Sequence, residues 1–303
     1  MIKSKTLIDK VNEFYVNKST IIYAINEYYD NLLSKNESYV SILNEIGALK
    51  FEIAKNEYNG NGVNNELEQK LKNLELEKLN TIKNSGYFDA INKVIECKIC
   101  KDKGVILGRR CKCFNKRLTE VSLKYLGVTK KEPCNFENAT ATEIENQKLL
   151  LKKYATNFPK VNVKNFVLTG NVGTGKTYLS KCVYAEILNK GYNAIFLTAT
   201  ELNNVFLKMH LGEVDRTVIN DILQGADLLV IDDLGTEPKY NNVTVEFLLS
   251  LISERLDKSK PFIITTNLSL SEIKERYNER LVSRLSGEKT VILPFKHKDL
   301  RIK

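Results

Sequence analysis

The sequence predicts a two-part α/β chain: a helical N-terminal region with a cluster of cysteines, followed by a domain built on a mostly parallel sheet. Two observations predict this division. Apolar residues recur at helical spacing from the start to about residue 94, and from about residue 147 short apolar strands alternate with amphipathic helices. Such alternation is typical of a parallel sheet covered by helices on both faces.

Composition places the chain among ordinary globular proteins. It has 303 residues, 43% of them hydrophobic and 27% charged, which is enough for two domains. No apolar run approaches the length of a membrane span, and the start, MIKSKTLIDK, lacks the apolar core of a signal peptide. We therefore expect a cytoplasmic protein with no membrane partner. The net charge of +9 suits a nucleic-acid partner, although a Lys-rich genome bias would explain it equally well.

The N-terminal region reads as amphipathic helices broken once, by YNGNGVNN at 58–65. Such helices either pack on one another or offer a face to a partner protein. The apolar residues at helical spacing are Val11, Phe14, Tyr15, Ile22, Ile25, Ile42, Ile46, Leu49, Ile53, Leu67, Leu71 and Leu74.

Four cysteines lie between residues 95 and 114, in the pattern C-x₂-C-x₁₀-C-x-C: Cys97, Cys100, Cys111 and Cys113. Two close pairs joined by a short loop can converge on one tetrahedral Zn²⁺ as four thiolates, which leaves no open position and predicts a structural site. Free or redox-active thiols are the alternative. Basic residues around the cysteines favour either a DNA contact or a solvated surface.

A short helix is expected at Lys116–Tyr125, and a connector containing Pro133 follows at Leu126–Asn146. The alternating pattern then predicts helices at 147–157, Lys176–Lys190, Glu201–Met209, Val243–Leu256 and Leu270–Leu285. It predicts strands at Asn165–Thr169, Ala194–Thr198, Asp227–Asp232, Phe262–Thr266 and Thr290–Pro294.

The segment GNVGTGKT, Gly170–Thr177, fits the phosphate-binding pattern G-x-x-x-x-G-K-[ST] between a strand and a helix. Its glycines let backbone N–H groups point at phosphate oxygens, and the helix N-terminus adds partial positive charge. We expect Lys176 to reach the β- and γ-phosphates of ATP and Thr177 to bind Mg²⁺. The predicted nucleotide-binding residues are Gly170, Gly173, Thr174, Gly175, Lys176, Thr177, Tyr178 and Asp232.

Acidic and polar residues follow two later strands. ADLLVIDD ends in Asp232, which we expect to hold Mg²⁺, and Asp233, which could orient the attacking water. PFIITTN ends in Asn267, placed to contact the γ-phosphate unless it only forms a turn. Arg280 and Arg284 lie four apart on one helix face, where either could enter a neighbouring subunit's site or form a surface salt bridge.

In this order and spacing, the P-loop, tandem-acid strand, TTN and ERLVSRL resemble an AAA+ ATPase. More narrowly, residues 133–303 resemble bacterial helicase loaders of the DnaC/DnaI type and the related IstB transposition ATPases, and NFENA at 135–139 resembles the start of their ATPase domain. The resemblance implies that Arg284 is an arginine finger, Asn267 sensor 1 and Arg301 the sensor-2 arginine. Only nine residues follow TVILP, so we expect no C-terminal lid.

The resemblance implies a helicase loader that acts in DNA replication initiation. Residues 1–130 would be a zinc-containing adaptor that docks on the hexameric replicative helicase, 131–146 a linker, and 147–303 the ATPase domain. That domain would self-associate and bind single-stranded DNA, with Lys208, His210 and Arg216 as basic candidates and Phe206 as a stacker, more simply explained as core. Asp233 stands where AAA+ proteins commonly have Glu, which agrees with slow hydrolysis used as a switch.

Two other functions fit the sequence. The first is an IstB-like transposition or phage-replication ATPase that recruits a different protein. The second is a non-enzymatic zinc and DNA-binding adaptor with a vestigial nucleotide site, against which the intact Lys176, Thr177, Asp232 and Asp233 argue.

Overall fold

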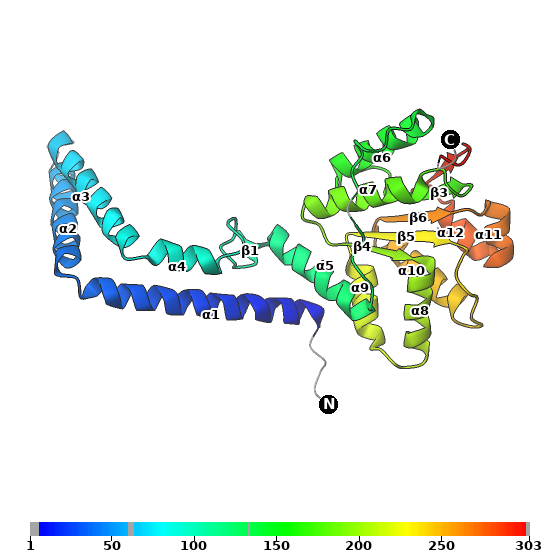
Figure 1. The fold of residues 1–303 in the computed structure, drawn as a ribbon, viewed down its shortest axis with the longest axis horizontal. Helices are drawn as coiled ribbons and strands as arrows, with labels where there is room; N and C mark the ends of the chain where they lie inside the picture. Colours follow the sequence, from blue (N-terminus) through cyan, green and yellow to red (C-terminus); the bar gives the residue numbers. More distant parts are fainter. Residues whose placement is uncertain (1–5, 60–63, 133, 301–303) are drawn as a thin grey trace. The chain divides into compact units, whose positions relative to one another are not determined.

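A computed structural model describes residues 6–59, 64–132 and 134–300 (Figure 1). The chain forms two compact units, Asn12–Arg109 and Arg110–Lys303 with Met1–Val11. The helical N-terminal region and the α/β domain predicted from the sequence are both present. Within the described ranges, no helix has the length and apolar character needed to span a bilayer.

The N-terminal region consists of four helices and a two-stranded hairpin: α1 (Leu7–Ser34), α2 (Glu37–Tyr58), α3 (Asn65–Asn84), α4 (Tyr87–Val94), β1 (Val105–Ile106) and β2 (Arg109–Arg110). Of the four apolar positions predicted on α2, Ile42, Ile46 and Leu49 are buried, and Ile53 is half-buried. Asparagines begin two of the helices, because the side chains of Asn36 and Asn64 accept hydrogen bonds from N–H groups of the first turns of α2 and α3.

The second unit is built on a five-stranded parallel sheet in the order β4-β5-β6-β3-β7. Its strands are β3 (Asn165–Gly170), β4 (Ala194–Thr198), β5 (Leu228–Leu234), β6 (Phe262–Thr266) and β7 (Thr290–Phe295). This confirms the predicted parallel sheet. Because β5, β6 and β3 are neighbours, the polar residues at their carboxyl ends share one edge of the sheet, which is where α/β sheets bind ligands.

Helices cover both faces of this sheet. Figure 1 shows α6 and α7 on one side, and α8, α9 and α10 on the other. The helices are α5 (Lys112–Leu126), α6 (Glu145–Asn157), α7 (Lys176–Asn189), α8 (Ala199–His210), α9 (Arg216–Gly225), α10 (Thr244–Asp257), α11 (Leu270–Arg276) and α12 (Glu279–Leu285), with a 3₁₀ turn at Thr142–Ile144.

One helix prediction was wrong, and one helix was not predicted. The single helix expected at Leu270–Leu285 is two, because Tyr277 ends α11 with non-helical backbone angles and Asn278 caps α12 by accepting a hydrogen bond from the N–H of Leu281 at 2.8 Å. Helix α9 was missed, although its buried residues lie at helical spacing: Val218, Ile219, Ile222 and Leu223.

Helix α5 packs against the turn between α7 and β4. Asn115 Nδ2 donates to the Gly191 carbonyl at 2.9 Å, and Thr119 Oγ1 donates to Asn193 Oδ1 at 2.8 Å. Gly191 has φ of 88°, and a Cβ there would lie 2.2 Å from Cγ of Lys112. The close approach of helix and turn therefore requires glycine at this position.

Part of the predicted linker contributes to the core of this unit. Phe136, Ala139 and Ile144 are each at most 5% exposed and belong to the apolar cluster formed by α6, α7 and the sheet. The predicted domain boundaries at 130/131 and 146/147 stay a prediction.

A buried arginine on the other side of the sheet joins two segments, the end of α9 and the residues before β6. Arg255 of α10 is 0% exposed, and its guanidinium donates to the carbonyls of Leu223, Ala226 and Pro261. Burial lowers the pKa of Arg255 to about 10, so the group stays protonated at neutral pH. The arginine supplies donors to the carbonyls of Leu223 and Ala226, and to the Pro261 carbonyl, which also accepts from the N–H of Leu229.

We predict that Arg255→Met lowers the free energy of unfolding by about 3 kcal/mol, because three backbone carbonyls each lose a hydrogen bond from the buried guanidinium. Urea denaturation monitored by circular dichroism measures this change. Lys258→Met is the control, since Lys258 is exposed near the end of the same helix. This substitution should change the free energy of unfolding by about 0.5 kcal/mol or less. Equal stability of the two variants would contradict the assignment.

Candidate functional site: a P-loop cavity and a cysteine cluster

The loop between β3 and α7 has the backbone that a phosphate-binding loop needs. Gly173 and Gly175 have φ values of 77° and 91°, which favour glycine. A Cβ on Gly170 would lie 2.2 Å from the carbonyl oxygen of Phe295, and one on Gly173 would lie 1.9 Å from Asp299 Oδ1. The glycines therefore allow both the turn and the close approach of the chain that follows β7.

Lys176, the first residue of α7, turns back onto this loop. Its Nζ donates to the carbonyls of Gly170 at 2.7 Å and Asn171 at 2.6 Å, and to Asn267 Oδ1 at 2.9 Å. Burial lowers the pKa of Lys176, while Asp233 and Asp232 act in the opposite direction. The ammonium group is thus held by neutral oxygens in a position from which it can exchange them for phosphate oxygens.

The two tandem acids, Asp232 and Asp233, lie in different environments. Asp232 is 4% exposed, and its Oδ1 accepts hydrogen bonds from Thr177 Oγ1 at 2.9 Å and Thr265 Oγ1 at 2.7 Å. Burial raises the pKa of Asp232, and the charge of Asp233 raises it further. A hydroxyl and a carboxylate oxygen at this separation fit the oxygen ligands of Mg²⁺.

Asp233 is directed into the cavity by an irregularity in β5. The pairing of β5 with β6 shifts between Ile231 and Leu234, and Asp233 has φ of 56°. Its N–H donates to Thr265 Oγ1 at 2.9 Å. A non-glycine residue in this conformation at a strand end is typical of a functional site.

These residues surround a cavity of about 730 Å³, within the usual range for a ligand site. Of the predicted nucleotide-binding residues, Gly173 through Tyr178 line it, as do Asp233 and Asn267. Gly170 and Asp232 lie behind this lining and contact it through Lys176 and Thr177.

The sequence did not identify the wall formed by residues 134–144. This wall contributes Cys134, Asn138, Ala139, Thr140, Ala141 and Ile144 to the cavity. Thr236 and Leu300 line the cavity elsewhere. The run of small residues at 139–141, beside the NFENA segment, was the available signal.

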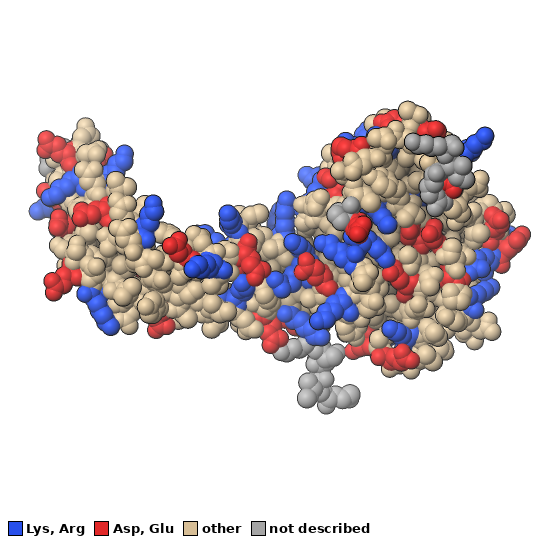
Figure 2. Space-filling view, viewed as in Figure 1, with Lys and Arg blue, Asp and Glu red and all other residues tan. Residues whose placement is uncertain are grey.

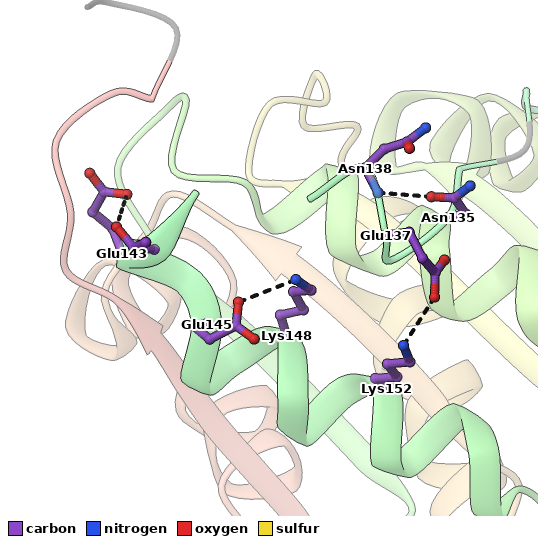
Figure 3. Close-up of polar contacts among 8 residues, drawn as sticks. Asn135, Glu137, Asn138, Glu143, Glu145, Lys148 and Lys152 are labelled. Carbon is purple, nitrogen blue, oxygen red and sulfur yellow. Dashed lines mark hydrogen bonds and ion pairs between the residues drawn. The ribbon is translucent and has the colours of Figure 1, made fainter. Parts of the chain in front are cut away.

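Polar contacts hold this wall in place (Figure 3). Asn135 Oδ1 accepts from the Asn138 N–H at 2.9 Å, and Glu137 pairs with Lys152 of α6 at 3.0 Å. Tyr178 Oη donates to the Asn135 carbonyl at 3.1 Å, which ties the wall to the helix that follows the P-loop.

Of the two predicted arginines, Arg284 lies within the described residues. It is exposed on α12 and does not line the cavity. Arg301 lies outside the described residues, but its neighbour Leu300 donates its N–H to the Gly173 carbonyl at 3.0 Å, so the chain after β7 reaches the P-loop.

The DNA-contact candidates comprise exposed basic residues and one buried aromatic residue. Lys208 and His210 are exposed on α8, and Arg216 lies over the ring of Phe247 at 5.2 Å. Phe206 is 3% exposed and stacked on Phe247, so it is core, as the simpler explanation had it. On the face in Figure 2, basic and acidic side chains are interspersed.

The four cysteines converge. The Sγ atoms of Cys97, Cys100, Cys111 and Cys113 all lie within 4.8 Å of one another. Zn²⁺ with four Zn–S bonds of about 2.3 Å separates its ligands by about 3.8 Å, so this donor set fits a structural zinc ion. Asp102, 2% exposed, accepts hydrogen bonds from the N–H groups of Glu96 and Cys97 and so fixes the first cysteine pair.

We predict that the full chain holds about one zinc ion, because four thiolates complete a tetrahedral shell. Cys100→Ser should lose it, and Cys182→Ala should keep it, since Cys182 lies in the core of the second unit. Metal content after dialysis, by inductively coupled plasma mass spectrometry, measures both. Retention of zinc by Cys100→Ser would contradict the site.

We predict that Lys176→Ala weakens binding of ATP by about tenfold to a hundredfold, because a charge-assisted contact to phosphate is lost. Titration with a fluorescent ATP analogue measures the dissociation constant. Lys153→Ala, at an exposed position of α6, is the matched control and should bind as the parent does. Unchanged affinity of Lys176→Ala would remove Lys176 from the site.

Comparison with known proteins agrees with this geometry. The model of the family described as IstB-like ATP binding protein matches residues 109–284. The replicative helicase loader DnaC of Escherichia coli K12 is 30% identical over 159 residues, which are 50% of this chain and 62% of the loader. The DnaC loader of Buchnera aphidicola subsp. Baizongia pistaciae is 25% identical over 169 residues, 54% of this chain and 67% of the loader.

Among solved structures, the crystal structure of the DnaC helicase loader is similar with a TM-score of 0.46 and 26% identity, over 55% of this chain and 94% of that one. The sequence match to the Escherichia coli K12 loader, in contrast, spans under two thirds of that protein's length. The P-loop unit has the predicted AAA+ fold, with a parallel five-stranded sheet in which β6 lies between the P-loop strand β3 and β5, the strand of the tandem acids. Since the family model covers more than half of its residues, this chain belongs to the family of IstB-like ATP binding proteins.

Proposed function

We propose that this chain is a DnaC-type loader that delivers the replicative DNA helicase during replication initiation. The observation that carries the proposal is the 30% identity with the replicative helicase loader DnaC over 159 residues. It gains support from the complete set of P-loop contacts in the cavity. Membership of the family supports a role as an AAA+ ATPase in DNA replication.

The proposed ATPase reaction assigns a task to each cavity residue. Lys176 would leave the carbonyls of the loop for the β- and γ-phosphates, and Asn267, released from Lys176, would contact the γ-phosphate. Thr177 and Asp232 would hold Mg²⁺, which neutralises charge on the phosphates. Asp233 would orient the attacking water. Contacts this complete argue against a vestigial site.

The hydrolysis would serve as a slow switch rather than as rapid turnover. Arg284 is exposed and outside its own chain's cavity, which suits an arginine that enters the site of a neighbouring copy. Self-association would then be needed for hydrolysis, and Arg301 would act from the chain that follows β7. ATP would favour the assembled, DNA-bound state, and hydrolysis would release the loader.

Single-stranded DNA would bind along α8 and the start of α9. Lys208 and His210 are exposed there, and Arg216 begins α9. The net charge of +9 supports a polyanion partner. With Phe206 buried, this contact would rest on the basic side chains rather than on stacking.

The helicase, a hexameric ring, would dock on the N-terminal helices. These helices expose large apolar side chains, and groups of such side chains mark protein interaction surfaces. The exposed apolar side chains are Val16, Ile21, Tyr23, Tyr28 and Leu32 of α1, Leu43, Phe51 and Tyr58 of α2, and Leu76 and Leu79 of α3. Zinc at the cysteine cluster would stabilise this small region, which has few buried residues of its own. Both partners would place the protein in the cytoplasm.

The family match favours a second candidate, an IstB-like transposition or phage-replication ATPase. It would use the same nucleotide cavity and recruit a different protein. The identity of the partner therefore separates the two candidates.

We predict that the full chain captures the host's replicative helicase, and that removing zinc with a chelator abolishes capture. A Tyr23→Ser, Phe51→Ser double variant should bind the helicase at least about tenfold more weakly, because it loses two exposed apolar side chains of the docking face. Leu211→Ser, at an equally exposed position of the ATPase unit, is the control. Biolayer interferometry with immobilised helicase measures the affinities. No capture by zinc-loaded parent protein would favour the second candidate.

A further inference from the structure

A buried carboxylate lies four residues after Asp233. Glu237 is 3% exposed, and its oxygens accept hydrogen bonds from the Gly235 N–H at 2.9 Å and from Tyr277 Oη. Within the described part of the chain, no lysine or arginine lies within 4.0 Å of this carboxylate. Desolvating an unpaired anion costs stability, and a pair of apolar side chains would fill the same space without that cost.

Two side chains that donate to Glu237 lie where α11 ends and the chain breaks before α12. Tyr277, 7% exposed, donates its hydroxyl to the Glu237 carboxylate, and the guanidinium of Arg276 donates to the Glu237 carbonyl. Two successive residues of the break are thus tied to one residue of the segment that follows the tandem acids. Burial raises the pKa of Tyr277, and the charge of Glu237 raises it further, so the hydroxyl stays a donor.

The break sets the direction of the helix that carries Arg284. Helix α12 has seven residues and is too short to be stable alone, so its orientation depends on its anchors. One anchor is the pair Leu281 and Leu285, both 0% exposed. The other is the start of the helix, which is capped by Asn278, the residue after Tyr277.

The same segment is fixed to the catalytic strand and to α8. Thr236 Oγ1 donates to the Asp233 carbonyl at 2.8 Å, and Asn203 Nδ2 of α8 donates to the Pro238 carbonyl at 2.7 Å. Asn203 is 2% exposed. Residues 235–238 therefore connect the end of β5 with α8 on one side and with α12 on the other.

We propose that Glu237 and Tyr277 are positioning residues that fix α12 relative to the end of β5, and so hold Arg284 in the orientation in which it enters a neighbouring copy's cavity. The inference rests on the proposed function, in which Arg284 acts in trans. Neither residue contacts the nucleotide cavity, so nucleotide affinity does not depend on the pair.

Tyr277→Phe tests this by removing one hydroxyl while keeping the ring. We expect kcat for ATP hydrolysis to fall by about tenfold or more, with the dissociation constant of ATP unchanged within about twofold. Tyr154→Phe is the matched control, a tyrosine of similar burial in the same unit whose hydroxyl donates to the Lys164 carbonyl. Thermal unfolding checks that each variant folds, and Glu237→Met, whose side chain offers no oxygen to the Tyr277 hydroxyl, replaces Tyr277→Phe if the latter does not fold. Unchanged kcat in the folded variant would overturn the proposal.

Mixing experiments separate this inference from the proposed function. Asp233→Asn chains have an inactive cavity and an intact Arg284, so mixing them with Arg284→Ala chains should restore hydrolysis. The same Asp233→Asn chains should also restore hydrolysis by Tyr277→Phe chains, whose own cavity is intact. Restoration of the first mixture alone would overturn the inference and leave Arg284 in place. Failure of both mixtures would overturn the trans role of Arg284 and the inference with it.

Discussion

The site depends on one carboxylate oxygen. Asp232 Oδ1 accepts hydroxyl hydrogen bonds from Thr177 at the start of α7 and from Thr265 on β6, so a single atom joins three elements distant in the sequence. The anion is tolerated in a position 4% exposed because these donors partly replace water. An oxygen fixed in this way is preorganised for a cation. The same contacts hold Thr177 and the P-loop in register with the tandem acids.

Much of this arrangement follows from local sequence. The apolar strands, the glycine pattern before Lys176 and the position of Asp232 at a strand end are local features, and each was found where it was expected. The order of the strands is not local, because β3 pairs with β6 and β7 rather than with β4. Once the sheet is parallel, however, the carboxyl ends share an edge, which is why Lys176 and Asn267 meet at 2.9 Å.

The features that sequence could not supply depend on long-range packing. The apolar helix pattern at 270–285 is continuous, and the break in it depends on the Asn278 cap together with the buried contact between Tyr277 and Glu237. The wall at 134–144 has little periodicity, and its place at the cavity comes from contacts with Tyr178 and α6. Whether Arg284 reaches a neighbouring copy depends on assembly, which no pattern within one chain encodes.

The packing of α5 against the Gly191 turn limits where recombination could exchange the N-terminal region of such a protein. Leu118, Leu123 and Leu126 are buried in this helix, and Asn193 is satisfied by Thr119. An ATPase unit that lost α5 in a recombination event would lose this buried apolar face and leave the buried Asn193 amide without its donor. A recombined protein therefore needs α5 from the same parent as its ATPase unit. An exchange of N-terminal regions that preserves the fold has its crossover upstream of residue 110.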